Sequence, residues 1–227
     1  MTQAAARRIC LVGATGLVGG RLIARCVGRE DVRLVAVARR EVSLPVGARM
    51  EVLVAEPREW PHAIETARAD VLVCALGTTM AKAGSAEAFR SVDHDLVLTT
   101  ARAAREAGIE RMIAISSVGA DPASRNFYLR VKGETEAALG KLGFARLDIL
   151  RPGLLLGPRG ERRPLEAAAQ IGAPLFDLAL HGRSRRFRSM RADALADVVL
   201  ALSHEKAPGR FVHEYDAMHL VLRRGRG

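Results

Sequence analysis

The chain has 227 residues, a formal net charge of +10 and 49% hydrophobic residues. This length supports one sizeable core, and the composition excludes a disordered or low-complexity chain. Aromatic residues make up only 4%, so we expect an aliphatic core typical of parallel sheets and no base-stacking platform for single-stranded nucleic acid. The three cysteines have no CxxC spacing, which excludes a disulfide scaffold and indicates a reducing compartment.

The N-terminal sequence favours a soluble, cytoplasmic protein. The apolar run that starts at Arg8 stops at a glycine loop within a few residues, so we expect no signal peptide. No stretch reaches the roughly 18 apolar residues that a membrane-spanning helix needs. We therefore predict a cytoplasmic location and no membrane partner.

Apolar runs and helical periodicities alternate along the chain. The predicted strands are Arg8–Val12, Val32–Ala38, Met50–Val54, Asp70–Leu76, Met112–Ile115, Leu147–Leu150 and a last one near Arg210–Glu214. The predicted helices run from the glycine loop to about Val27 and over His62–Ala67, Ser85–Gly108, Phe127–Leu142, Leu165–Ala169 and Ala192–His204. Right-handed crossovers between such units build a doubly wound parallel sheet. We predict an α/β Rossmann fold that forms a single domain over residues 1–227.

The chain after Gly153 is less regular than the rest. We expect a small C-terminal cap over the carboxyl edge of the sheet, with substrate-side segments at about 153–190 and 205–227. The arginine-rich run Arg183–Arg191 is interpreted as a solvated loop, or as a cationic rim that attracts an anionic cofactor or substrate, ahead of a nucleic-acid site. The tail from Arg223 is expected to fray.

A glycine loop follows the first predicted strand directly. In the spacing GxxGxxG, Gly13 would make the turn, Gly16 would let phosphates approach, and Gly19 would let helix and strand pack closely. A plain tight turn between strand and helix is the alternative interpretation. The strand–loop–helix context favours a dinucleotide site that also includes Thr15, Leu17 and Val18.

The end of the second strand indicates which dinucleotide this site prefers. An acidic residue about 20 positions after the glycine loop would bind the ribose hydroxyls of NAD, but the chain has Arg39 and Arg40 there. Arginine suits a phosphate, so we predict that this pair binds the 2′-phosphate of NADP and that NAD is the less favoured cofactor. The alternative is an exposed basic pair without a ligand.

Tyr128 and Lys132 are four residues apart on a predicted helix and therefore share one face. A free phenol has a pKa of about 10 and exchanges protons poorly at neutral pH, whereas a nearby ammonium favours the phenolate. Together with a hydroxyl from Ser116 or Ser117, at the end of the fifth strand, the pair would serve a hydride transfer. The sequence does not decide which of the two serine hydroxyls points inward.

The segments GATGLVGG, ISSVGADPASRNFYLRVKGETEAAL and ILRPGLLLGPR resemble the short-chain dehydrogenase/reductase superfamily. They are most similar to its atypical NAD(P)H-binding branch, which includes the Tat-interacting oxidoreductase-like proteins. The resemblance extends to about Asp197 and is most specific from Ser116 to Pro158. It implies that Ser117 orients a substrate carbonyl, that Tyr128 is the acid/base, and that Lys132 holds the nicotinamide ribose.

The same resemblance implies two further groups of cofactor contacts. The adenosine side would be lined by Leu76, Gly77 and Thr78, and the nicotinamide would be flanked by Pro152, Gly153 and Leu154. The chain departs from the family pattern at Asp93, where many relatives have an asparagine that belongs to the proton relay. Few residues remain after Gly157, so a bulky nucleotide-sugar pocket is not expected. Relatives often form a homodimer through the helices that begin here at Ser85 and Phe127.

These observations predict an NADPH-preferring oxidoreductase that transfers hydride to or from a small carbonyl or alcohol. The alternative is an NADPH-binding sensor or regulatory interaction protein with little turnover; a pure sensor has no need of the Tyr128–Lys132 pair. The scattered histidines show no metal-ligand spacing, so no metal site and no nucleic-acid partner are predicted. Cys74, within a predicted strand, is interpreted as a small core residue.

Overall fold

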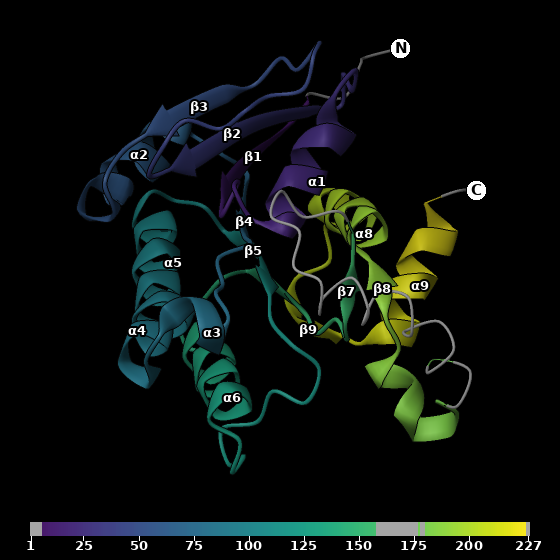
Figure 1. Cartoon of the computed structure of the whole chain (residues 1–227). Helices are drawn as coiled ribbons and strands as arrows, with labels where there is room; N and C mark the ends of the chain where they lie inside the picture. Colours follow the sequence, from purple (N-terminus) through teal and green to yellow (C-terminus); the bar gives the residue numbers. More distant parts are fainter. Residues whose placement is uncertain (1–5, 158–176, 178–179, 226–227) are drawn as a thin grey trace.

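A parallel sheet forms the centre of the molecule in the computed structural model, which describes residues 6–157, 177 and 180–225 (Figure 1). Its seven strands lie in the order β3-β2-β1-β4-β5-β6-β9, and every neighbouring pair is parallel. The strands are β1 (Arg7–Val12), β2 (Val32–Ala38), β3 (Glu51–Val54), β4 (Val71–Cys74), β5 (Arg111–Ile115), β6 (Arg146–Leu150) and β9 (Gly209–His213). This topology confirms the predicted Rossmann fold.

Helices cover both faces of the sheet (Figure 1). One face carries α1 (Leu17–Cys26), α8 (Ala192–His204) and α9 (Tyr215–Arg224), and the other carries α2 (Trp60–Ala67), α5 (Val97–Glu106) and α6 (Phe127–Leu139). The short elements are the 3₁₀ helices η1 (Pro57–Glu59) and η3 (Gly182–Phe187), α3 (Met80–Ala83), α4 (Ala86–Arg90), the π-helical segment η2 (Ser91–Leu96), and a two-stranded pair of β7 (Leu155–Leu156) and β8 (Met190–Arg191). Within the described part of the chain, no helix is long and apolar enough to cross a membrane.

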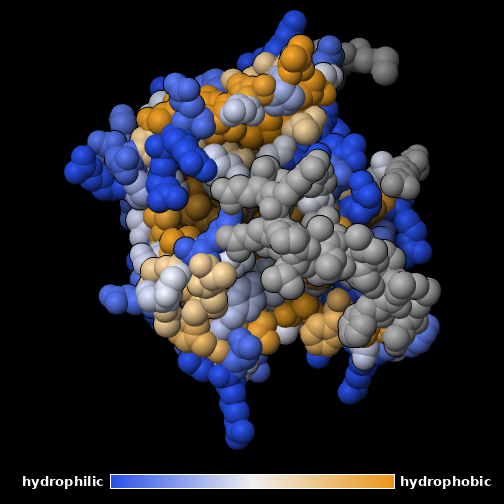
Figure 2. Space-filling view, in the orientation of Figure 1, coloured by the Kyte–Doolittle hydropathy of each residue, from blue (hydrophilic) through white to orange (hydrophobic). Residues whose placement is uncertain are grey.

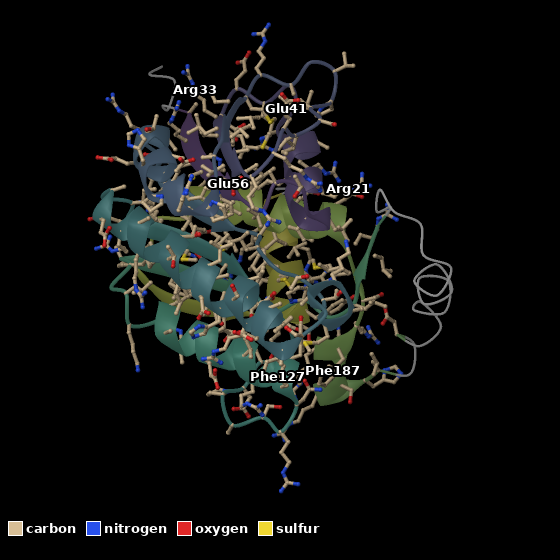
Figure 3. All side chains as sticks on the ribbon, turned by 60° about the vertical axis from the view of Figure 1, so that its left-hand side comes forward. Arg21, Arg33, Glu41, Glu56, Phe127 and Phe187 are labelled. Atoms are coloured by element: carbon tan, nitrogen blue, oxygen red, sulfur yellow. The ribbon has the colours of Figure 1, made fainter. Side chains whose placement is uncertain are left out.

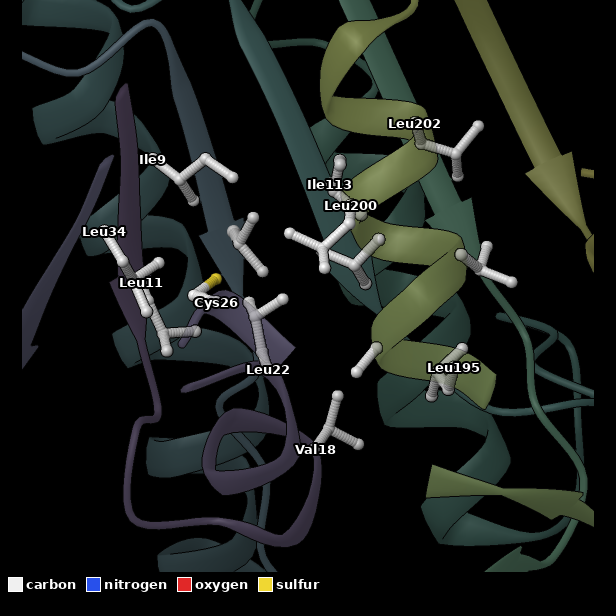
Figure 4. Packing of buried hydrophobic residues seen from close by; sticks show 14 of the residues in the cluster. Ile9, Leu11, Val18, Leu22, Cys26, Leu34, Ile113, Leu195, Leu200 and Leu202 are labelled. Carbon is white, nitrogen blue, oxygen red and sulfur yellow. The ribbon is translucent and has the colours of Figure 1, made fainter. Parts of the chain in front are cut away.

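Strand alternation divides the core into two layers. On β1, Ile9 and Leu11 pack toward α1 and α8, whereas Cys10 and Val12 pack toward α2 and α5. All four are fully buried, as expected for a strand that is covered on both faces. Figure 4 shows the first layer, in which α1 and α8 lie together over the sheet. Each buried aliphatic side chain contributes roughly 1.5–3 kcal/mol of transfer free energy.

The crossover from β2 to β3 has no helix. The loop of residues 39–50 makes this connection, and its side chains reach the surface, with Leu44 39% exposed and Val46 fully exposed. Figure 2 shows apolar atoms at the top of the molecule, where this loop and β3 lie in Figure 1. The end of β2 itself is buried at Val37 and Ala38, and exposure begins with the loop that follows.

The structure differs from the sequence prediction in three places. The helix predicted from Ser85 to Gly108 contains a π-helical turn, η2, between α4 and α5. Helix α9, whose Met218 is fully buried in the core, was not predicted, and it includes Arg223 and Arg224 from the tail that was expected to fray. The chain after Gly153 is only partly a cap: α8 covers a face of the sheet and β9 extends it. The helix predicted at Leu165–Ala169 lies outside the described residues.

Candidate functional site

The strand order reverses between β1 and β4, and ligands of open α/β sheets bind at the carboxyl side of such a reversal. The glycine turn lies there, and its backbone is tightly packed. Gly13 has φ +95°, and a Cβ at this position would lie 2.5 Å from the carbonyl carbon of Ala75, at the end of β4. A Cβ at Gly19 would lie 2.3 Å from the carbonyl oxygen of Gly13. Both positions therefore require glycine.

The amino end of α1 faces solvent at this turn. Its N-cap is Gly16, which has no side chain to cap the first turn, and both Thr15 and Gly16 are exposed. No acidic residue lies in the first turn. The positive end of the helix dipole is therefore uncompensated, and this arrangement suits a pyrophosphate. Leu17 is half-buried and Val18 is buried, so they contribute backbone rather than side chains to the loop.

Arg39 and Arg40 follow β2, which neighbours β1 in the sheet, so they lie at the same edge as the glycine turn. Both are exposed, and neither forms a hydrogen bond or an ion pair with the described residues. Glu41, labelled in Figure 3, comes next in the chain and is also exposed. Two unpaired guanidinium groups at this edge are available to an anionic ligand.

Lys132 lies in a buried polar cluster on the inner side of α6. Its Nζ is 2.7 Å from Oδ1 of Asp93, and neither side chain is more than 8% exposed. Oδ2 of Asp93 accepts a hydrogen bond from the backbone N–H of Thr78 (2.8 Å). Gly77 lies beside this pair, because a Cβ there would be 3.4 Å from Oδ1 of Asp93 and 3.7 Å from Lys132 Nζ. The structure thus brings together the predicted cofactor loop after β4 and the predicted catalytic lysine.

Tyr128 lies one turn before Lys132 on α6 and is half-buried. Its ring is 5.4 Å from the ring of Phe89 on α4, and the ring of Phe127 is 5.9 Å from the same phenylalanine. This aromatic cluster restricts the orientation of the phenol. Figure 3 shows Phe127 at the same end of the molecule as Phe187, which belongs to η3.

The two serines after β5 have different environments. Ser116 donates a hydrogen bond of 2.5 Å from Oγ to Glu136, a carboxylate that is only 3% exposed. Ser117 makes only a long contact, 3.4 Å, to the carbonyl of Val118. The hydroxyl of Ser116 is therefore occupied within the protein, whereas that of Ser117 has no strong partner among the described residues.

Glu136 is the central residue of a second buried cluster that the sequence reasoning missed. Arg151 donates from Nε and Nη2 to both of its carboxylate oxygens, at 2.6–3.1 Å. These hydrogen bonds raise the pKa of Arg151, so its guanidinium stays protonated. A cavity of about 10 Å³, lined by Ser116, Glu136, Lys132 and Asp93 among others, lies between the two clusters. The four-residue spacing from Lys132 to Glu136 on one helix face is the signal that could have revealed this carboxylate.

The predicted nicotinamide-side residues lie next to the serine loop. The N–H of Ser116 donates to the carbonyl of Leu150, and the N–H of Val118 donates to the carbonyl of Pro152. Gly153 lies against η3, because a Cβ there would be 2.7 Å from the carbonyl oxygen of Phe187. Pro152 is buried and Leu154 is 48% exposed. The segments that follow β5 and β6 are therefore joined by backbone hydrogen bonds and lie side by side.

The structure also places Cys74 and the arginine-rich run Arg183–Arg191. Cys74 lies in the core at 2% exposure, and burial raises the pKa of its thiol to about 11, so it is no nucleophile. The arginine-rich run forms η3 and β8, and its residues 183–187 are exposed to solvent. Phe187 lies near Gly119 and Leu129, close to the serine loop and to α6.

The glycine turn at the strand-order reversal and the buried Lys132 define this chain as a Rossmann-type dinucleotide-binding protein. A family described as NAD(P)H-binding matches residues 13–170. The chain belongs to this family. Two relatives named as mitochondrial Fmp52 proteins support the assignment: the one from Emericella nidulans is 39% identical over 73% of this chain and 74% of its own length, and the one from Eremothecium gossypii is 35% identical over 93% and 96%.

Solved structures agree with the fold. MoeE5, in complex with UDP-glucuronic acid and NAD, has a TM-score of 0.69 at 13% identity, with 90% of this chain and 74% of MoeE5 covered. A candidate NAD-dependent epimerase/dehydratase from Bacillus halodurans has a TM-score of 0.68 at 22% identity, with 96% of this chain and 100% of that chain covered. At these identities the likeness shows the Rossmann fold alone.

The relatives correct the expected location. The Fmp52 proteins of Emericella nidulans, Aspergillus niger and Eremothecium gossypii are named as mitochondrial, which contradicts the cytoplasmic location expected from the sequence. The expectation relied on missing secretory features and unpaired cysteines. These features argue against secretion but do not separate cytoplasm from mitochondria, because mitochondrial targeting segments are amphipathic and arginine-rich rather than continuously apolar.

Proposed function

We propose that the protein is an NADPH-preferring oxidoreductase that transfers hydride to or from a small carbonyl or alcohol. One observation carries this proposal: the ammonium of Lys132 lies beside Gly77 and Thr78, at the same sheet edge as the glycine turn, with Tyr128 one helical turn away. A site that only held a nucleotide would not need a phenol and an ammonium on one helix face. The arrangement therefore favours proton exchange at the point where hydride is transferred.

The residues at the carboxyl edge of the sheet fit a bound dinucleotide. The exposed amino end of α1, which has no side-chain cap and no acidic residue in its first turn, suits a pyrophosphate, and Arg39 and Arg40 supply charge for a 2′-phosphate. Leu76, Gly77 and Thr78 would line the adenosine side, and Pro152, Gly153 and Leu154 would flank the nicotinamide. The nicotinamide supplies or accepts the hydride when the cofactor is bound.

The protein side chains would perform the remaining chemistry. The phenol of Tyr128 donates a proton to the carbonyl oxygen during reduction and accepts it from the alcohol during oxidation. Lys132 holds the nicotinamide ribose and favours the phenolate electrostatically. Ser117 donates a hydrogen bond to the substrate oxygen and orients it toward Tyr128.

The first test is a calorimetric titration with NADPH and, separately, with NADH. We expect NADPH to bind at least about tenfold more tightly, which corresponds to roughly 1.4 kcal/mol. Replacing Arg39 and Arg40 together by alanine should bring the two affinities together, because the 2′-phosphate loses its partners. Arg33→Ala, at an exposed position on β2, is the matched control and should keep the preference. An unchanged preference in the double variant would refute the role of the pair.

Exchanging the serines one at a time tests the substrate-orienting hydroxyl. We expect Ser117→Ala to lower NADPH-dependent turnover by about tenfold or more, with little change in stability. Ser116→Ala should lower the free energy of unfolding by about 1–2 kcal/mol, because Glu136 loses a hydrogen bond in a buried site. Urea unfolding and steady-state kinetics on both variants check this division. Loss of turnover in the Ser116 variant alone would reverse the assignment.

A further inference from the structure

Asp93 connects two parts of the proposed site that are far apart in the sequence. It lies within the π-helical segment η2, and π-helical turns inside longer helices occur frequently at functional sites. Its side chain is completely buried, yet it carries a carboxylate that must find partners. Those partners come from the loop after β4 and from α6, so one side chain holds both segments.

One carboxylate oxygen of Asp93 forms an ion pair, and the other accepts a hydrogen bond. Oδ1 is 2.7 Å from Lys132 Nζ, and Oδ2 accepts from the N–H of Thr78 at 2.8 Å. The backbone of Asp93 is fixed as well, because its carbonyl oxygen accepts a hydrogen bond of 3.0 Å from Oγ1 of Thr135 on α6. The ammonium has three donors, so pairing with one carboxylate oxygen leaves others for a ligand hydroxyl.

We propose that Asp93 is a positioning residue that couples the cofactor loop Gly77–Thr78 to Lys132, so that the loop and the ammonium bind the dinucleotide as one unit. This inference rests on the proposed function. An asparagine at this position could accept from Thr78, but it would lack the charge that holds the ammonium. The carboxylate of Asp93 thus holds the ammonium of Lys132 at the sheet edge where the ribose of the cofactor would lie. The conformation of the loop Gly77–Thr78 and the position of the ammonium therefore depend on each other.

A double-mutant cycle on NADPH affinity tests the coupling. The proteins are wild type, Asp93→Asn, Lys132→Met and the double variant, each titrated with NADPH by calorimetry. We expect Lys132→Met to weaken binding about tenfold in the wild-type background and by at most about twofold in the Asp93→Asn background, because an unanchored ammonium contributes little. Asp95→Asn is the matched control, since this neighbouring carboxylate is 62% exposed and pairs with His94; it should leave affinity within about twofold.

The outcomes of the cycle separate this inference from the proposed function. Equal losses from Lys132→Met in both backgrounds, or a larger loss in the Asp93→Asn background, would mean that Asp93 serves only as a structural partner, and would overturn the coupling while leaving the cofactor site intact. No NADPH binding by the wild type would remove both proposals. If Asp93→Asn does not fold, amide hydrogen exchange of Thr78 is compared between the wild type and Lys132→Met, both without cofactor. Faster exchange in the variant supports the coupling, and unchanged exchange overturns it.

Discussion

Replacing Tyr128 by phenylalanine should lower NADPH-dependent turnover by about 10²- to 10⁴-fold, the usual contribution of a positioned acid or base. The substitution removes only the hydroxyl. The ring should keep its place against Phe89, 5.4 Å away, so the fold and the site around Lys132 should persist. NADPH affinity should stay within about twofold of the wild type, because the phenol acts on the substrate oxygen. The measurements are NADPH oxidation over a panel of small aldehydes and ketones, and calorimetry with NADPH.

Three results would change the mechanism. Equal turnover by the variant and the wild type would remove Tyr128 from the reaction. Tight NADPH binding by a wild-type protein that turns over no member of the panel would favour the alternative of a sensor or regulatory protein. Loss of both turnover and NADPH affinity would indicate that Tyr128 supports the cofactor site rather than the chemistry.

The sequence predicted the middle of the sheet well because the inner strands are buried on both faces. Val32–Ala38 reads as a nearly continuous apolar run, and the structure has β2 at those residues. Elements whose burial depends on a few contacts were missed. No helix was predicted over Tyr215–Arg224, and α9 has a single fully buried side chain, Met218, which packs with the layer formed by α1 and α8.

The candidate site could be located from the sequence, but its internal contacts could not. The glycine spacing and the Tyr128–Lys132 pair are local patterns, and the sheet places both at one edge. Asp93 was noticed only as a departure from an asparagine, and its pairing with Lys132 depends on a π-helical turn that no local periodicity predicts. The choice between the serines likewise depends on Glu136, which lies 20 residues away in sequence and reaches Ser116 only in the folded protein.

Gly19→Ala should strongly lower both the stability of the protein and its affinity for NADPH. The new Cβ would lie 2.3 Å from the carbonyl oxygen of Gly13 and 2.8 Å from Cα of Ala14, so the turn and the start of α1 must separate. Because these obstacles are backbone atoms, the strain cannot be relieved by a side-chain rotation. We expect a loss of about 1–3 kcal/mol in the free energy of unfolding and at least about a tenfold loss in NADPH affinity.

Gly20→Ala provides the matched control, since it adds the same methyl group one residue further along α1. No heavy atom lies within 4 Å of a Cβ at Gly20, and this position is exposed. Alanine is the better helix former, so this variant should gain about 0.5–1 kcal/mol and bind NADPH unchanged. Urea unfolding and NADPH calorimetry on both variants separate packing from binding. If Gly19→Ala binds NADPH as tightly as Gly20→Ala does, the close backbone packing of the turn does not set cofactor affinity, and binding must depend on other contacts at this sheet edge.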